Sequence, residues 1–87
     1  MATVVLPRSL AALFPGLDRR VVVPGATVAE VIAGLEALAP GMADRILVPG
    51  PAVRPHLNLF VDGEPAGVAT PVGPTSVVHV IPAVSGG

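Results

Sequence analysis

The final residues, Ser85, Gly86 and Gly87, combine small side chains with a carboxylate that can take part in acyl transfer. Glycine lacks a Cβ, so a diglycine thread fits a narrow channel that other residues would block. Adenylation converts a carboxylate into an electrophile with a good leaving group, and a sulfur nucleophile can then displace AMP. We therefore expect Val84, Ser85, Gly86 and Gly87 to enter a partner's active site, where the Gly87 carboxylate becomes a thiocarboxylate.

The chain needs a partner for this chemistry. Its sequence has no phosphate-binding loop, so ATP is expected to be used by a separate adenylating enzyme. It has no cysteine, and sulfur is therefore not carried on a side chain. No Ser/His/Asp arrangement or carboxylate pair is recognisable, and we expect a carrier, not an enzyme, with no bound cofactor.

Composition excludes several classes of protein. The 87 residues fit one small domain, and with 52% hydrophobic and 13% charged residues they are too apolar for intrinsic disorder. A net charge of −1 and the lack of Trp and Tyr argue against nucleic-acid binding. Pro or Gly interrupts every apolar run before the roughly 20 residues of a membrane span. Arg8 interrupts the first apolar stretch, which makes a signal peptide a poor match, so we expect a cytoplasmic protein, monomeric when alone.

All five basic residues are arginine and none is lysine. Two explanations stay open. Codon bias in a GC-rich genome produces this pattern without any role in function. Alternatively, a protein with an activated C-terminus avoids lysine amines, which can attack an acyl group, whereas a guanidinium stays protonated.

One long helix stands out in the central part of the chain. Thr27 and Glu30 form a T-x-x-E capping box, and Pro40-Gly41 ends the helix. A single apolar stripe follows the cap, and it needs a sheet to cover it. The stripe consists of Val28, Val31, Ile32, Leu35 and Leu38.

The remaining segments predict a sheet. Strands are expected at residues 3–6, 20–23, 57–61, near 66–68 and at 77–81, with an Asp62-Gly63 hairpin turn. Ser9 is expected to cap a short helical turn over residues 10–14, residues 42–47 to form another turn, and residues 49–55 a loop. The order β-β-α-β-β-β predicts an α+β fold, a ubiquitin-like β-grasp with a mixed four- to five-stranded sheet and one main helix on one face. Because Pro82 is expected to stop strand pairing, we predict a domain over 1–82 and a flexible tail over 83–87.

A helix on one side leaves the other sheet face open. Strand alternation directs Phe60, His79 and Ile81 away from the helix, so we predict a partner-docking face there. The proline-rich loop covering this face, or ordinary scattered surface apolar residues, would explain the same pattern. His56 and His79 lack a third ligand at a recognisable spacing, and no metal site is expected.

Two segments carry a family resemblance. Ile81–Gly87 reads Ile-Pro-Ala-Val-Ser-Gly-Gly, and Asn58–Glu64 reads Asn-Leu-Phe-Val-Asp-Gly-Glu. They resemble the C-terminal signature and the Asn-x-Phe/Tyr-Val-Asn-Gly/Asp-Glu stretch of the MoaD/ThiS sulfur carriers, closest to the CysO-like branch. Thr70-Pro71 and Pro7 also fit, so that the resemblance covers most of the chain. Two departures are Ser85 for the commoner Ala or Thr, and a run of residues 73–77 without the family's frequent Asp-Glu pair.

This resemblance implies a β-grasp fold, a docking face that includes Phe60 and Ile81, and activation of Gly87 by a ubiquitin-activating-type adenylating enzyme. The sulfur would go to a biosynthetic enzyme, for cysteine or a sulfur-containing secondary metabolite in preference to molybdopterin or thiamine. A ubiquitin-like modifier, joined through Gly87 to lysines, would use the same tail. A binding or scaffold domain with an incidental tail is a third hypothesis.

Overall fold

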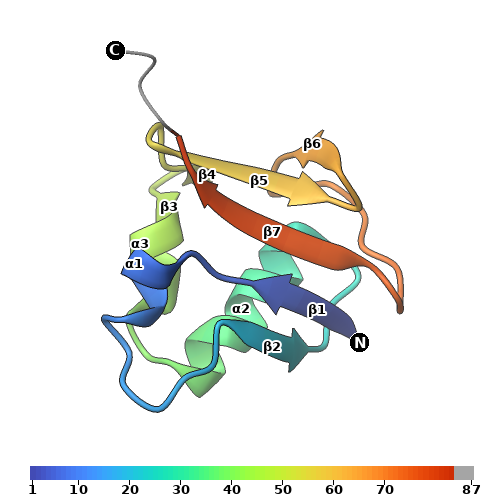
Figure 1. The fold of residues 1–87 in the computed structure, drawn as a ribbon. Helices are drawn as coiled ribbons and strands as arrows, with labels where there is room; N and C mark the ends of the chain where they lie inside the picture. Colours follow the sequence, from blue (N-terminus) through green and yellow to red (C-terminus); the bar gives the residue numbers. More distant parts are fainter. Residues whose placement is uncertain (84–87) are drawn as a thin grey trace.

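The computed structural model describes residues 1–83, and a five-stranded sheet with a two-stranded ribbon and three helices makes up this part of the chain (Figure 1). The elements are β1 (Ala2–Val5), α1 (Arg8–Ala11), β2 (Arg20–Val23), α2 (Val28–Leu38), α3 (Met42–Ile46), β3 (Leu47–Val48), β4 (Ala52–Val53), β5 (Leu57–Val61), β6 (Glu64–Ala66) and β7 (Val77–Pro82).

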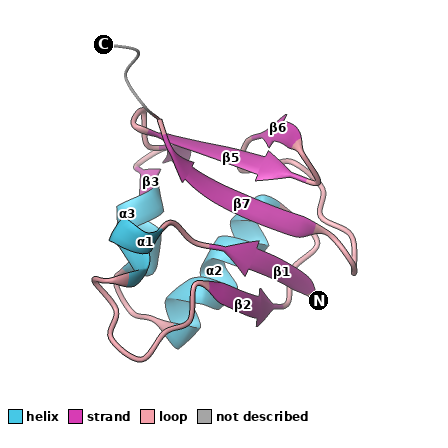
Figure 2. Ribbon diagram, viewed as in Figure 1, coloured by secondary structure: helices cyan, strands magenta, loops and turns pink. Residues whose placement is uncertain are grey.

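The main sheet has the strand order β2-β1-β7-β5-β6. Strand β7 returns beside β1 and runs parallel to it, whereas all other neighbours in this sheet are antiparallel. The longest helix, α2, lies across one face, and the viewer in Figure 2 looks at the other. This arrangement confirms the predicted β-grasp, with a mixed sheet and one main helix on one face.

The core fills the space between α2 and the sheet. Alternate residues of the central strands point into it, as the pleat of a strand requires. In β7, for example, Val78 and Val80 are buried while Val77 and His79 are only partly so. The largest of the fully buried side chains are Leu6, Leu35, Met42, Ile46, Val4, Val23, Val28, Val31 and Val78.

Helix α2 begins at the predicted cap. Thr27 Oγ1 accepts the Glu30 backbone N–H at 3.2 Å, which confirms half of the capping box. Glu30 Oε1 accepts the N–H of Ala26 at 3.0 Å instead of that of Thr27. The predicted stripe is buried except at Leu38, which is 58% exposed. Leu38 lies about 70° from the mean direction of the four buried residues at 3.6 residues per turn, and the next residue, Ala39, takes the buried position instead.

Glu36 joins α2 to α3, a role that its position on the polar side of the helix did not suggest. Its two carboxylate oxygens accept the backbone N–H groups of Gly41 and Ala43, each at 2.9 Å. These bonds satisfy donors at the start of α3 that have no partner within the helix. They also lower the pKa of Glu36, the bond from Gly41 contributing most.

Four local predictions need correction. Pro7, with its fixed φ, occupies the N-cap of α1 and Ser9 lies inside the helix. The predicted loop over residues 49–55 contains β4, which pairs with β3. The weak strand after the hairpin turn starts earlier, directly after Gly63, because the tight turn sets the register with β5. Pro82 does not stop pairing: it lies opposite Leu57 at the end of β7.

Within residues 1–83, no helix is both long and apolar enough to span a lipid bilayer.

Candidate functional site

Strand β7 brings the chain to one corner of the sheet. Pro82 is paired with Leu57, and the N–H of Ala83 donates to the carbonyl oxygen of His56 at 2.8 Å. The chain is therefore hydrogen-bonded to the domain one residue beyond Pro82. The four residues predicted to enter a partner's active site lie outside the described residues: Val84, Ser85, Gly86 and Gly87.

A row of side chains crosses the face of the sheet opposite α2. Directly paired residues of neighbouring strands share a face, and the register aligns one residue from each strand in the order β2, β1, β7, β5, β6. The row consists of Arg20, Val5, His79, Phe60 and Pro65.

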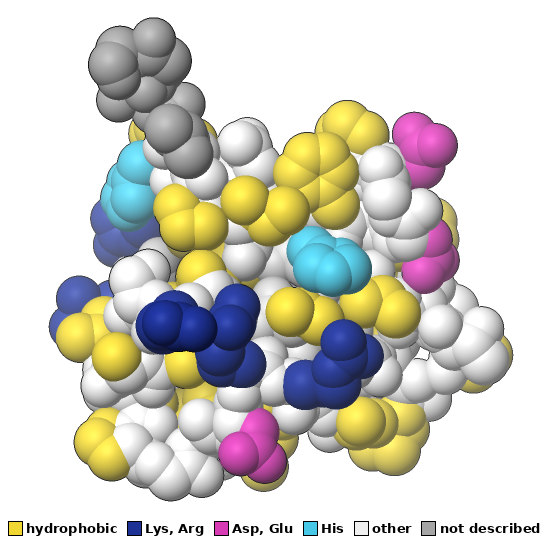
Figure 3. Space-filling view, in the orientation of Figure 1, with side chains coloured by type: hydrophobic (Ala, Val, Ile, Leu, Met, Phe, Trp, Pro, Cys, Tyr) yellow, Lys and Arg dark blue, Asp and Glu magenta, His cyan; other side chains and the backbone are white. Residues whose placement is uncertain are grey.

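Two large apolar side chains flank this row on the same face. Ile81 lies two residues beyond His79 on β7 and is 41% exposed, and Val22 lies on β2 and is 55% exposed. We call Val5, Val22, Phe60, His79 and Ile81 the open-face patch. Figure 3 shows apolar side chains around the central histidine on this side of the molecule, with arginines below this histidine and to its left.

The structure brings together the three residues predicted for docking, Phe60, His79 and Ile81. Their part in docking remains a prediction. Val5, Val22 and Arg20 were missed, although the alternation of β1 and β2 held the signal. Each lies an odd number of residues from a buried position on its own strand, and therefore on the opposite face.

Asp62 stabilises the turn next to the site by bonding to the start of β7. It has a positive φ of 50° at the turn between β5 and β6, as predicted for an Asp-Gly turn. Its Oδ1 accepts the N–H of Val77 at 2.9 Å, and its own N–H donates to the carbonyl oxygen of Val77 at the same distance. The bond from Val77, followed by one from Ser76, lowers the pKa of Asp62. This residue therefore holds the turn against the start of β7.

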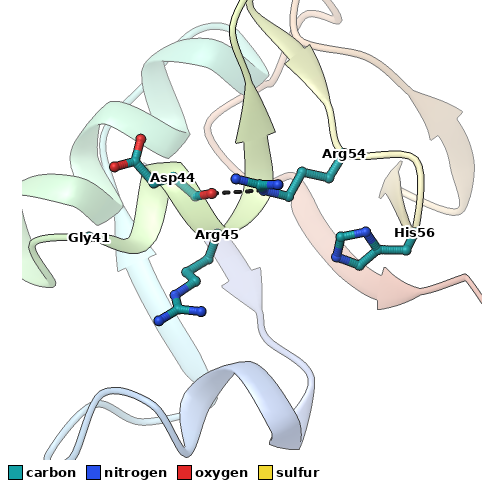
Figure 4. Close-up of a pocket in the computed structure, with 5 residues that line it drawn as sticks. All are labelled: Gly41, Asp44, Arg45, Arg54 and His56. Atoms are coloured by element: carbon teal, nitrogen blue, oxygen red, sulfur yellow. Dashed lines mark hydrogen bonds between the residues drawn. The ribbon is translucent and has the colours of Figure 1, made fainter.

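A polar hollow of about 560 Å³ lies beside the corner where β7 ends (Figure 4). Two arginines and a histidine line it, against one acidic residue. The lining residues are Gly41, Asp44, Arg45, Arg54 and His56. Sequence reasoning treated His56 as an ordinary surface residue and assigned no role to the two arginines. The hollow forms where α3 and the segment before β5 pack together, and this contact cannot be read from local sequence patterns.

In residues 1–83, no three His, Asp or Glu side chains lie close enough together to hold a metal ion.

The sequence as a whole matches a known family. The model of the ThiS family aligns with residues 9–87, nearly the full length of the chain. The chain belongs to the ThiS family.

Solved structures extend this result. A chain of the BexX/CysO complex from Amycolatopsis orientalis superposes with a TM-score of 0.87 at 30% identity, and each chain is covered completely. CysO from Mycobacterium tuberculosis gives a TM-score of 0.86 at 30% identity, with 97% of this chain and 100% of that chain covered. SAMP1 from Haloferax volcanii gives 0.76 at 27% identity, covering 99% and 98%. Curated protein sequences gave no significant match. This ThiS-family chain is thus a CysO-like protein, and its relatives are small β-grasp proteins.

Proposed function

We propose that the chain is a sulfur carrier whose working group is the carboxylate of Gly87. The match to the ThiS family, which extends through Gly86 and Gly87, supports this proposal most strongly. The corner at Ala83 adds support, because the hydrogen bond to His56 fixes the chain just before the diglycine segment. From Ala83, four residues reach at most about 14 Å, enough to enter a channel in a partner protein.

The thiocarboxylate forms in two displacements. A Gly87 carboxylate oxygen attacks the α-phosphorus of ATP in a ubiquitin-activating-type adenylating enzyme, and pyrophosphate leaves. A hydrosulfide equivalent then attacks the carbonyl carbon and AMP leaves with the bonding electron pair. The product is a thiocarboxylate. Its sulfur attacks an electrophile bound in a second enzyme and displaces the leaving group of that electrophile. Water then cleaves the acyl–sulfur bond, which releases the sulfur-containing product and restores the Gly87 carboxylate. The chain itself contributes the acyl group and the surfaces that dock on both enzymes, with no catalytic group of its own.

The open-face patch is the proposed docking surface. Apolar side chains such as Phe60 and Ile81 lose unfavourable contact with water when a partner covers them. The patch and the corner at Ala83 are joined by β7, so a partner that covers the patch also lies near the start of the tail. Cysteine or a sulfur-containing secondary metabolite is the favoured product, with molybdopterin and thiamine as further options.

Intact-mass analysis tests the proposal. The protein is incubated with ATP, an adenylating enzyme and sulfide, and the mass is expected to rise by about 16 Da, because sulfur replaces one oxygen. Peptide mapping is expected to place the gain at Gly87. A chain that lacks Gly86 and Gly87 is the control, and it is expected to fold normally without any gain. Unchanged mass of the intact chain with each adenylating enzyme of the host would contradict the proposal.

A second candidate function is that of a ubiquitin-like modifier. The likeness to SAMP1, at 27% identity over nearly the whole chain, favours it. A modifier would pass the same adenylated carboxyl group to a lysine amine and form an isopeptide bond. Detection of isopeptide-linked remnants of this tail on cellular proteins, together with no thiocarboxylate in cells, would favour the modifier over the carrier.

A further inference from the structure

The basic hollow beside the end of β7 is built from two separate segments. Arg45 comes from α3, while Arg54 and His56 come from the segment that leads into β5 (Figure 4). The lining contains two arginines and a histidine but a single acidic residue, Asp44. In Figure 4, the Asp44 carboxylate points away from Arg54. The hollow therefore offers an excess of hydrogen-bond donors to an anionic group.

Arg54 is held in place by two bonds to α3. Its Nε donates to the backbone oxygen of Asp44 at 2.8 Å, and its backbone N–H donates to the oxygen of Ile46 at 2.9 Å. The Nε bond fixes the guanidinium plane but does not use the two terminal nitrogens. Glu36 fixes the other end of α3 through its bonds to Gly41 and Ala43. The hollow is thus shaped before any ligand arrives, which lowers the entropic cost of binding.

The hollow lies at the base of the C-terminal segment. The carbonyl oxygen of His56 accepts the N–H of Ala83 at 2.8 Å. A smaller neighbouring hollow of about 240 Å³ shares Arg45 and His56 and is also lined by Pro82. A partner that takes in the residues after Ala83 therefore comes close to Arg45 and His56.

The position favours a protein carboxylate over a nucleotide phosphate as the ligand. The reacting carboxyl group of Gly87 can lie up to about 14 Å from Ala83, so a phosphate attached there is far from the hollow when the tail is extended. Guanidinium groups bind carboxylates in a bidentate manner, and such pairs set the orientation of docking. The centre of the open-face patch, around Phe60, is largely apolar and cannot supply this charged contact.

We propose that the hollow formed by Arg45, Arg54 and His56 binds an acidic loop at the mouth of the channel in the adenylating enzyme. This inference rests on the proposed carrier function. It adds that the surface of the adenylating enzyme that meets the hollow is acidic. The pairing directs the tail into the channel, while the open-face patch supplies apolar contact area.

Kinetics with charge-matched variants test this inference. Arg45 is exposed and suits substitution, whereas Arg54 is tied to the backbone. The initial rate of thiocarboxylate formation is measured against carrier concentration, with the adenylating enzyme that loads the wild-type chain. Arg45→Ala is expected to raise KM about fivefold and Arg45→Glu more than about tenfold, with kcat unchanged. Arg45→Lys, which keeps the charge, is expected to recover at least about half of the loss in kcat/KM.

The control is Ala33→Glu, on the exposed side of α2. It lowers the net charge by one, as Arg45→Ala does, and is expected to leave KM within about twofold of wild type. Raising NaCl from 50 to 300 mM is expected to raise the wild-type KM, and the Arg45→Ala KM less steeply. Equal KM values for Arg45→Ala and Ala33→Glu would overturn the inference, although loading of the wild type would leave the carrier function intact. If no adenylating enzyme loads the wild type, both proposals fail.

A titration separates the two kinds of anion. ATP is added to the ¹⁵N-labelled carrier alone, without the enzyme, and amide shifts are followed. Shifts at Arg45, Arg54 and His56 that saturate below about 1 mM would assign the hollow to phosphate and overturn the inference. The expected result is no saturable change at these residues.

Discussion

Phe60 on β5 and His79 on β7 occupy directly opposite positions on the sheet face that α2 does not cover. Val5 on β1 is paired with His79 from the other side. The centre of the open face is therefore an imidazole between an aromatic ring and a branched aliphatic side chain. All three residues are partly buried, so they present a firm surface that a partner can pack against.

The first prediction concerns the open-face patch. Replacement of Ile81 by Glu puts a charge where we propose apolar contact with the adenylating enzyme, and it is expected to raise KM for loading by at least about tenfold. Leu38→Glu is the matched control, because Leu38 is also exposed but lies on α2. Equal effects of the two variants on KM would argue against docking through this face. Circular dichroism with thermal unfolding checks that both variants are folded.

The second prediction concerns Gly25, which stands next to α2. A Cβ there would lie 2.7 Å from the backbone nitrogen of Val31, and the residue has a φ of +152°. Gly25→Ala is therefore expected to lower the free energy of unfolding by about 1–3 kcal/mol. Gly67→Ala is the control, since a Cβ added at Gly67 would meet nothing within 4 Å. Urea denaturation measures the stability of both variants. Equal midpoints would show that α2 shifts to make room for the added Cβ with little loss of stability.

The third prediction is a loss of stability in acid that depends on Glu36. Its folded-state pKa lies below the unfolded value, because the carboxylate accepts the N–H groups of Gly41 and Ala43 only in the folded chain. The stabilisation is complete above the unfolded pKa of about 4.3 and is lost as the pH falls through the folded value. Unfolding by urea between pH 7 and pH 3 is the measurement.

Glu36→Gln keeps one acceptor oxygen but has no group that ionises in this pH range. This variant is expected to be less stable at pH 7 and to lose less stability than the wild type as the pH falls. Glu64→Gln, on the exposed edge strand β6, controls for a general change of charge. If the free energies of unfolding of Glu36→Gln and of the wild type fall in parallel over this pH range, Glu36 does not have the stabilising role described here.

The fourth prediction concerns the cap of α2. Thr27→Ala removes the oxygen that accepts the N–H of Glu30, and it is expected to lower the free energy of unfolding by about 1 kcal/mol. Thr27→Ser keeps that oxygen and is expected to stay within about 0.5 kcal/mol of wild type. Urea denaturation measures both variants, and equal losses would show that the hydroxyl is not the stabilising group.

Local sequence signals predicted much of the fold. The cap at Thr27, the apolar stripe that follows it and the Asp62-Gly63 turn each depend on neighbouring residues alone. The structure has the cap, the turn and the stripe as far as Leu35. The open face at Phe60 and His79 followed from strand alternation once one covered face was assumed. These features need no knowledge of contacts between distant segments.

Other features depend on contacts that local patterns do not contain. Glu36 lies outside the apolar stripe of α2, and its hydrogen-bond partners begin five positions later, at the start of α3. Pro82 looked like the end of pairing because it lacks an N–H, but the edge it presents to Leu57 does not require one. Arg45 and Arg54 are nine positions apart in sequence, and the hollow between them exists only after α3 packs on the segment before β5.

The most direct test of the central claim adds one alanine after Gly87. The extended chain is expected to keep the wild-type melting temperature, because the addition lies beyond residues 1–83 that form the described fold. With ATP, the adenylating enzyme and sulfide, the wild type is expected to gain about 16 Da, and the extended chain to gain nothing. An uncut extended chain that gains this mass as readily as the wild type would contradict the account.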